Sequence, residues 1–247
     1  MWLRSRDTTA AVKARWDVTA GRALPVADPR TKKGRGSKEA LLRAARVVFG
    51  RDGFAAARVS DVAAEAGMSN GAFYRYYVDK NAVLIELITM LLQQLYDESQ
   101  ARWSPRDPVE SVVVTTERYF RFYARNADLF GVLHETMQTH PEIEAMQADN
   151  RKDFHERITR MIGRAVEKGL MRADVDPDLG AALLGGMTEH YAYYRFVLHR
   201  YPERDLGDVS RELAKVWAVG TFSEQARSDM ASGDMASGDM ASGEGAP

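Results

Sequence analysis

The four residues at positions 69–72 combine types and spacing that suit direct contact with a polyanion. Ser69 is a favoured helix N-cap residue, so Asn70, Gly71 and Ala72 should form the first turn of a short helix. Small side chains there leave the free backbone N–H groups accessible, and the helix dipole attracts phosphate. Such a turn is able to approach the major groove of a DNA duplex.

The histidines of the run H-E-T-M-Q-T-H do not fit a zinc site. His134 and His140 are six residues apart, about 240° around a helix, whereas H-E-x-x-H places its histidines four apart on one face. The chain has no cysteine, which excludes disulfides and thiolate metal sites. We expect no catalytic residue, no metal and no cofactor. A helical enzyme is the least favoured alternative.

The net charge of −1 hides an uneven distribution. Residues 1–80 carry 16 Lys and Arg against 8 Asp and Glu, a net charge of +8, whereas the rest of the chain carries −9. This asymmetry indicates a basic module that meets nucleic acid or an anionic surface. A solvated basic tail is the alternative that the charge count leaves open.

Helical periodicity dominates the chain, and no useful stretch alternates in the manner of a strand, so we expect an all-α fold. The first helix should begin near Ser37 and stop at Gly53. Two short segments follow, residues 59–67 and 69–77, joined by a tight turn. Segments this short are stable only when packed together, which predicts a helix-turn-helix, with an ordinary helical hairpin as the alternative.

Helix-start signals continue beyond this region. They predict later helices that begin at Asp79, Asp107, Asn126, Pro141 and Asp176, and a last helix around Val209 to Trp217. The end of the chain instead repeats the unit D-M-A-S-G, a low-complexity sequence that cannot bury a core.

The stretch from Glu39 to Lys80 closely resembles the DNA-binding domain of the tetracycline-repressor (TetR) family of transcriptional regulators. It contains V-x-x-V-A-x-x-A-G-M-S, then G-x-F-Y-x-Y-Y, and a closing lysine. The resemblance implies an N-terminal three-helix DNA-binding domain with a helix-turn-helix, followed by a C-terminal helical domain for ligand binding and dimerisation. No apolar run is long enough for a secretory signal or a membrane span, so we expect a cytoplasmic protein.

The resemblance assigns roles to the residues of the helix-turn-helix. Asn70, Gly71 and Ala72, next to the cap Ser69, would reach base edges, and Phe73 and Tyr77 would hold the recognition helix in the core. The phosphate contacts are expected from Tyr74, Tyr76 and Lys80. Arg75 either reaches the duplex or is solvated.

Two further features near this domain concern DNA. The family usually has Thr or Ser where this chain has Ala57 and Arg58, so a hydroxyl cap is lost and Arg58 would replace its phosphate contact by charge. The basic residues Lys32, Lys33 and Arg35 lie just before the first expected helix, where an arm could add minor-groove contacts or only dangle.

These features divide the chain into four parts: a flexible basic arm (1–36), a helix-turn-helix domain (37–80), an effector-binding and dimerisation domain (81–222) and a low-complexity, disordered tail (223–247). Polar or soft residues on apolar helix faces are the ligand-binding candidates: Tyr119, Tyr123, His134, Met137, His155, Glu189 and His190. The expected dimer seam consists of Leu183, Gly186, Met187, Tyr194, Val197, Leu213, Val216 and Trp217, although burial within one subunit would explain the same pattern.

Together these expectations describe a homodimeric repressor that a small hydrophobic effector releases from palindromic double-stranded operator DNA. A DNA-binding regulator controlled by a protein partner is the second reading.

Overall fold

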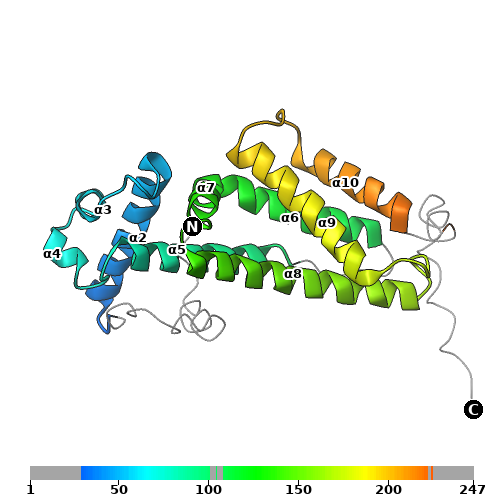
Figure 1. The fold of residues 1–247 in the computed structure, drawn as a ribbon, viewed down its shortest axis with the longest axis horizontal. Coiled ribbons are helices and arrows are strands. Elements are labelled where there is room, and N and C mark those ends of the chain that lie inside the picture. Colours follow the sequence, from blue (N-terminus) through cyan, green and yellow to red (C-terminus); the bar gives the residue numbers. More distant parts are fainter. Residues whose placement is uncertain (1–28, 101–103, 105–107, 222–223, 225–247) are drawn as a thin grey trace, which may run out of the picture. The chain divides into compact units, whose positions relative to one another are not determined.

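The structure is a computed structural model that describes residues 29–100, 104, 108–221 and 224 (Figure 1). The repeat tail, apart from Glu224, and most of the expected arm lie outside this part of the chain. The described ranges contain helices and no strand, which confirms the all-α prediction. They divide into two compact units: residues 1–97 with 123–151, and residues 98–122 with 152–247.

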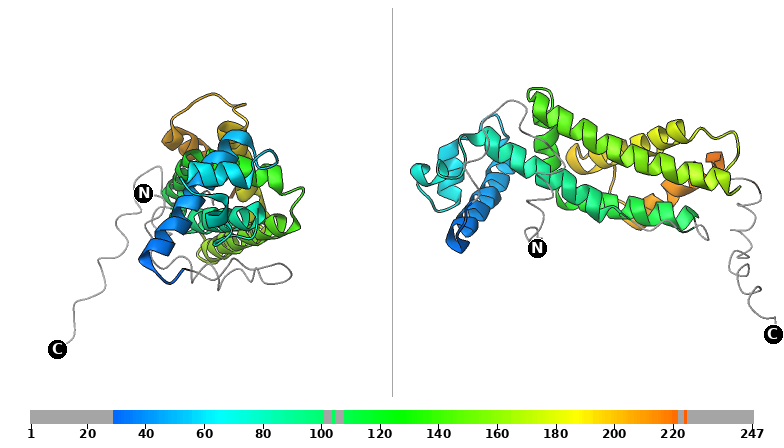
Figure 2. Two further views of the ribbon diagram at one scale, coloured as in Figure 1. Left: turned by 90° about the vertical axis from the view of Figure 1, so that its left-hand side faces the viewer. Right: turned by 90° about the horizontal axis from the view of Figure 1, so that it is seen from below.

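Unit 1 contains the helix-turn-helix and the helices that pack on it. Its elements are α2 (Lys32–Asp52), α3 (Val59–Glu65), α4 (Asn70–Phe73), nearly all of α5 (Lys80–Glu98), α7 (Ala127–Thr136) and the first part of α8 (Pro141–Glu167). Figure 2 shows α2, α3 and α4 beside the N-terminal end of α5. The compact unit therefore joins the predicted DNA-binding domain to helices that follow Lys80.

The first helix begins five residues earlier than the sequence suggested. Thr31 is the N-cap, and its Oγ1 accepts a hydrogen bond from the N–H of Gly34 at 3.0 Å. Ser37 is therefore inside α2 and does not cap it, and residues 32–36 belong to a helix and not to a flexible arm. The predicted stop is confirmed, because Gly53 ends α2 with φ of +76°, a conformation that favours glycine.

Unit 2 contains most of α6 (Pro108–Arg125), the rest of α8, α9 (Pro177–Ala192), the π-helix η1 (Tyr193–Val197) and α10 (Leu206–Thr221). Helices α9 and α8 approach closely at Gly180, where an added Cβ would lie 3.2 Å from Cδ1 of Ile162. The core consists of buried residues from four helices and the loop after α8: Val112, Val113, Ile162, Ala165, Met171, Ala181, Leu184, Ala214, Trp217 and Ala218.

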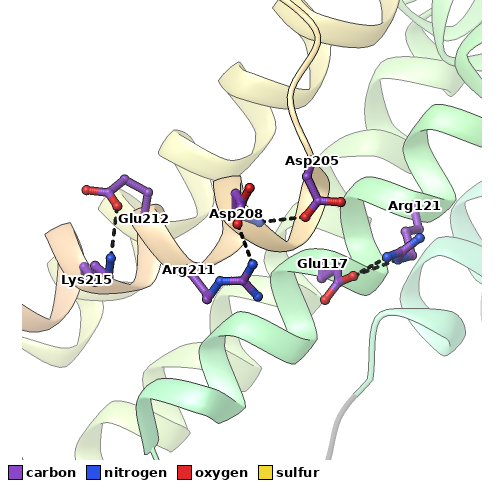
Figure 3. Close-up of polar contacts among 7 residues, drawn as sticks. All are labelled: Glu117, Arg121, Asp205, Asp208, Arg211, Glu212 and Lys215. Carbon is purple, nitrogen blue, oxygen red and sulfur yellow. Dashed lines mark hydrogen bonds and ion pairs between the residues drawn. The ribbon is translucent and has the colours of Figure 1, made fainter. Parts of the chain in front are cut away.

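Charged pairs cover the start of α10 and the neighbouring α6 (Figure 3). Asp205 accepts a hydrogen bond from the N–H of Asp208 at 3.0 Å and so caps α10. The hydrogen bond to Asp208 raises the pKa of Arg211, and the charges of Asp208, Asp205 and Glu117 act in the same direction. The pairs are exposed to solvent, so each adds little stability.

Candidate nucleic-acid interface

The first turn of α4 presents small and polar groups to solvent. Ser69 accepts a hydrogen bond from the N–H of Ala72 at 3.3 Å, which confirms it as the N-cap. Ser69, Asn70 and Gly71 are exposed and Ala72 is half-buried. The side chain of Asn70 and the free N–H groups of this turn are therefore accessible to a duplex.

Two buried aromatic side chains hold α4 in place. Phe73 and Tyr77 have no exposed surface, and their ring centroids lie 5.8 Å apart. Val62 and Ala63 of α3 are also buried, and α3 packs against α4. The prediction that Phe73 and Tyr77 are core residues is confirmed, and the exposed turn has a rigid support.

The other side chains of this segment differ in exposure. Tyr74 is 54% exposed and its ring meets Phe73 edge to face, at 5.5 Å between centroids. Arg75 is exposed and Tyr76 is half-buried. Tyr74 and Arg75 are thus accessible to phosphate, and their contacts with DNA stay a prediction.

Lys80 makes contacts within the domain that the sequence did not predict, and its phosphate contact stays a prediction. Its Nζ donates to the carbonyl oxygens of Phe54 at 2.8 Å, Ala55 at 3.1 Å and Ala57 at 2.9 Å. An ammonium has three donors, so all of them are in use. A phosphate contact would require Lys80 to give up one of these bonds, and in this structure it secures the turn between α2 and α3.

Arg58 is exposed at the N-cap of α3, as its expected phosphate contact requires. Its backbone N–H donates to the carboxylate of Asp61 at 3.1 Å. The start of α3 is therefore stabilised by the acidic residue three positions later, despite the lost hydroxyl.

The basic residues expected in the arm lie in the first turn of α2. Lys32, Lys33 and Arg35 are exposed, and Arg35 donates to the carbonyl oxygen of Arg30 at 3.1 Å. This turn carries no acidic residue. Its positive charges oppose the helix dipole, so helix stability does not explain them, whereas an anionic partner would.

The expected ligand-binding residues are divided between the two units. In unit 1, Tyr123 stacks on Phe130 with centroids 3.6 Å apart, its hydroxyl lies 3.1 Å from Nε2 of His134, and Met137 is half-buried nearby in sequence. The structure therefore brings Tyr123 and His134 together. The proposal of one ligand site that includes them stays a prediction.

The remaining ligand-binding candidates lie in unit 2 in separate contacts. Tyr119 meets Phe154 edge to face, His155 pairs with Asp178 at 2.7 Å, and Glu189 is half-buried. His190 is exposed; it stacks on Tyr194 and its Nε2 lies 3.2 Å from the hydroxyl of Tyr201. Burial raises the pKa of the neighbouring Tyr191, and the charge of Arg195 opposes this rise.

The expected dimer seam is only partly exposed. Leu183, Gly186, Met187 and Val216 are exposed, whereas Tyr194, Val197 and Leu213 are half-buried. Trp217 is only 5% exposed and belongs to the core of its own unit, so its assignment to a dimer seam was wrong. Two further apolar residues are more than half exposed, Leu179 on α9 and Val219 on α10. Together with Leu183, Met187 and Val216 they form an exposed apolar stripe.

The pentapeptide from Gly67 to Gly71 matches the G-x-S-x-G pattern of hydrolases, but its setting differs. In those enzymes the serine stands between a strand and a helix. Here Ser69 follows helix α3 and its Oγ caps α4. The sequence therefore matches the pattern, but Ser69 does not have the structural setting of a hydrolase nucleophile.

The described residues contain neither a metal-binding cluster nor a membrane-spanning helix. No group of three or more His, Asp or Glu in the described ranges could hold a metal ion. No helix there is both long and apolar enough to cross a membrane.

Comparisons with known proteins agree with this geometry. Residues 37–87 match the family model of bacterial regulatory proteins of the tetR family. An uncharacterised HTH-type transcriptional regulator of Bacillus subtilis, YdgC, is 28% identical over 165 residues, which cover 64% of this chain and 80% of YdgC.

Solved structures show the same fold at low identity. The ketosteroid transcriptional regulator KstR2 of Mycobacterium tuberculosis superposes with a TM-score of 0.59 and 19% identity, over 81% of this chain and all of KstR2. SmeT, the repressor of the Stenotrophomonas maltophilia multidrug efflux pump SmeDEF, has a TM-score of 0.55 and 20% identity, over 76% and 92% of the two chains. Another SmeT structure is a complex with triclosan.

An exposed recognition turn on a buried aromatic support, in a chain whose described elements are all helices, is typical of a helix-turn-helix transcriptional regulator. Residues 37–87 of the chain form a DNA-binding domain of the TetR family of bacterial regulatory proteins. This family assignment indicates a DNA-binding regulator and not an enzyme.

Proposed function

We propose that the protein is a homodimeric repressor that binds a near-palindromic operator and releases it when a small hydrophobic effector binds to the helices after Lys80. One observation carries the DNA-binding part of the proposal. The accessible turn from Ser69 to Ala72 stands on Phe73 and Tyr77, which are fully buried. A rigid support of this kind is what base recognition requires, because a mobile turn would pay an ordering cost on binding.

The charge distribution supports a duplex as the partner. Lys32, Lys33, Arg35, Arg58 and Arg75 are all exposed in the part of the chain that carries a net charge of +8. Phosphate contacts of this kind give affinity and register, whereas Asn70 would read sequence by a bidentate contact to adenine.

The exposed apolar stripe of α9 and α10 supports a homodimer. Leu179, Leu183 and Met187 lie on one face of α9, since they are four residues apart. Val216 and Val219 add to this surface from α10. Each such side chain contributes about 1.5–3 kcal/mol when it is fully buried, so pairing with a second copy is favourable. A two-fold dimer would place its recognition helices about 34 Å apart, one turn of DNA.

The hydrophobic class of the effector is supported by the relatives. KstR2 is described as a ketosteroid regulator, and SmeT forms a complex with triclosan. Unit 2 of this chain offers aromatic side chains that would suit such a ligand, among them Tyr119, Phe154 and Tyr191.

Footprinting on the DNA upstream of the protein's own gene tests this proposal. We expect one protected region with two-fold symmetry, and its release by a probe such as triclosan or a long-chain fatty acid. Protection that no member of a panel of hydrophobic probes reverses would favour control by a protein partner. The absence of any protected region would contradict the proposal.

A further inference from the structure

The turn between α2 and α3 is held from both sides by residues distant in the chain. Its amides are bound by Glu135 of α7, whose carboxylate accepts from the N–H of Phe54 and the N–H of Ala55, both at 3.1 Å. Its carbonyl oxygens are bound by Lys80, as described above. Because α3 begins at the end of this turn, the turn fixes where α3 starts.

The carboxylate of Glu135 also lies close to Gly53, where α2 ends. A Cβ added to Gly53 would be 3.5 Å from Oε2 of Glu135. A side chain at position 53 would therefore meet the same carboxylate that binds the amides of Phe54 and Ala55. A movement of Glu135 would stretch or break its two hydrogen bonds to this turn.

A second contact joins α7 to the body of α2. The guanidinium of Arg46 forms a bidentate pair with the carboxylate of Asp128, with both N–O distances at 2.7 Å. The same group donates to the side-chain oxygen of Asn126 at 3.0 Å and to the carbonyl oxygen of Arg125 at 3.1 Å. Paired geometry of this kind fixes orientation as well as distance.

Both contacts come from one face of α7. Asp128 and Glu135 are seven residues apart, which is two helical turns. One end of this face holds α2 at Arg46, and the other holds the turn that follows α2. Helix α7 therefore contacts the DNA-binding helices at two points and resists both translation and rotation of α2.

We propose that Glu135, together with the Arg46–Asp128 pair, positions α3 and α4 for operator binding, so that these residues determine DNA affinity without touching DNA. This inference rests on the proposed function and adds to it the element that sets the geometry of the recognition turn. Glu135 and Asp128 are positioning residues, since they act through the α2–α3 turn and through α2.

Glu135→Gln tests the proposal most sharply. The amide keeps the size of the side chain but presents only one acceptor oxygen, so one of the two N–H groups loses its partner. We expect affinity for a duplex selected by the wild-type protein from a random library to fall about three- to thirtyfold. Affinity for a scrambled duplex and the salt dependence should not change, because no phosphate contact is lost.

Glu144→Gln is the matched control, since it makes the same change on an exposed residue of α8 in the same unit. It should leave both affinities at the wild-type value. Asp128→Asn is the second arm, and it should lower affinity for the selected duplex in the same selective manner as Glu135→Gln.

Amide hydrogen exchange followed by NMR gives a readout that does not depend on DNA. In Glu135→Gln, exchange at Phe54 or Ala55 should accelerate about tenfold while amides in the middle of α2 stay protected. If exchange at Phe54 and Ala55 stayed at the wild-type rate, the proposal would be overturned, even if DNA binding failed for other reasons. Equal losses for the selected and scrambled duplexes would show that Glu135 only supports the fold, and would also overturn the proposal.

Discussion

Tyr74 and Lys80 are close in the chain and were both expected to contact phosphate, yet their surroundings differ. The ring of Tyr74 is half exposed, whereas the ammonium of Lys80 is bound by three carbonyl oxygens. A carbonyl at the end of a helix or in a turn needs a donor as much as a phosphate does. The closing lysine of the motif therefore stabilises the fold of the domain, and its contact with phosphate stays a prediction.

Lys80→Met should destabilise the domain. Three carbonyl oxygens lose a charged donor, and we expect the free energy of unfolding to fall by about 2 kcal/mol, the scale of hydrogen bonds to charged groups. Urea denaturation followed by circular dichroism measures the loss. Lys168→Met, at an exposed lysine after α8, is the control and should change stability little. Unchanged stability in Lys80→Met together with a weaker salt dependence of DNA binding would return Lys80 to a phosphate role.

Asn70→Ala should relax sequence recognition at one base pair of each half-site. Loss of a bidentate contact to adenine costs about 1–3 kcal/mol of discrimination. Competition between duplexes that differ at single positions measures this effect. If the variant discriminates at every position as well as wild type does, Asn70 does not read a base.

At the level of helices, α9 and α10 expose apolar side chains that no other described residue of the same subunit covers. Leu183 is 59% exposed and Val216 is 61% exposed, whereas Trp217 next to it is buried in its own unit. Neighbouring positions on one helix thus face a core and a surface. Apolar side chains left exposed beside such a core are suited to packing against a second copy.

Leu183→Glu should convert the dimer to a monomer. The change places a charge in an apolar interface, where it would be buried without a partner. Light scattering coupled to size exclusion measures the mass. Ala148→Asp, which adds a charge to an exposed position of α8, is the control and should stay dimeric. A dimer that persists in Leu183→Glu would place the interface elsewhere.

Local signals in the sequence were sufficient for most helix boundaries. Ser69, Asp79 and Asp176 each accept a hydrogen bond from a backbone N–H one turn or less ahead, as their residue types predict. The start of α2 was misjudged because Gly34 and Gly36 resemble a linker, while Thr31 supplies a cap that overrides them. The cost of a glycine in a helix is similar in size to the stabilisation that an N-cap hydrogen bond gives, so glycines near a capped start do not prevent the helix.

The contacts that α7 makes with α2 and with the α2–α3 turn could not be predicted from sequence. Glu135 is 81 positions from Phe54, and Asp128 is 82 positions from Arg46. The sequence around a single carboxylate on a helix does not predict which distant residue it will contact. The π-helix after α9 was missed for a related reason, since its apolar spacing resembles that of an ordinary helix.

For the whole molecule, the near-zero net charge conceals two oppositely charged parts, with +8 before Asn81 and −9 after Lys80. The first turn of α2 carries three of the exposed positive charges, and they oppose the dipole of their own helix. Positive charges at this position destabilise the helix in the free protein, whereas next to phosphate groups they would be favourable. The charge distribution is therefore an argument about the partner and not about the fold.

Combined substitution of Lys32, Lys33 and Arg35 by Gln should weaken binding to all duplexes alike. Each lost phosphate contact reduces the slope of log K against log salt by about 0.9, so the total change should be up to about 2.7 per subunit. The ratio of affinities for selected and scrambled duplexes should stay the same. An unchanged slope would mean that this turn does not touch the duplex.

The most direct test of the central claim is fluorescence anisotropy of the wild-type protein with a duplex that it has selected and with a scrambled duplex of the same composition, at several salt concentrations. We predict that the selected duplex binds at least about a thousandfold more tightly, with two subunits per site and a steep salt dependence for both duplexes. Equal affinity for the two duplexes, or no binding at physiological salt, would contradict the account.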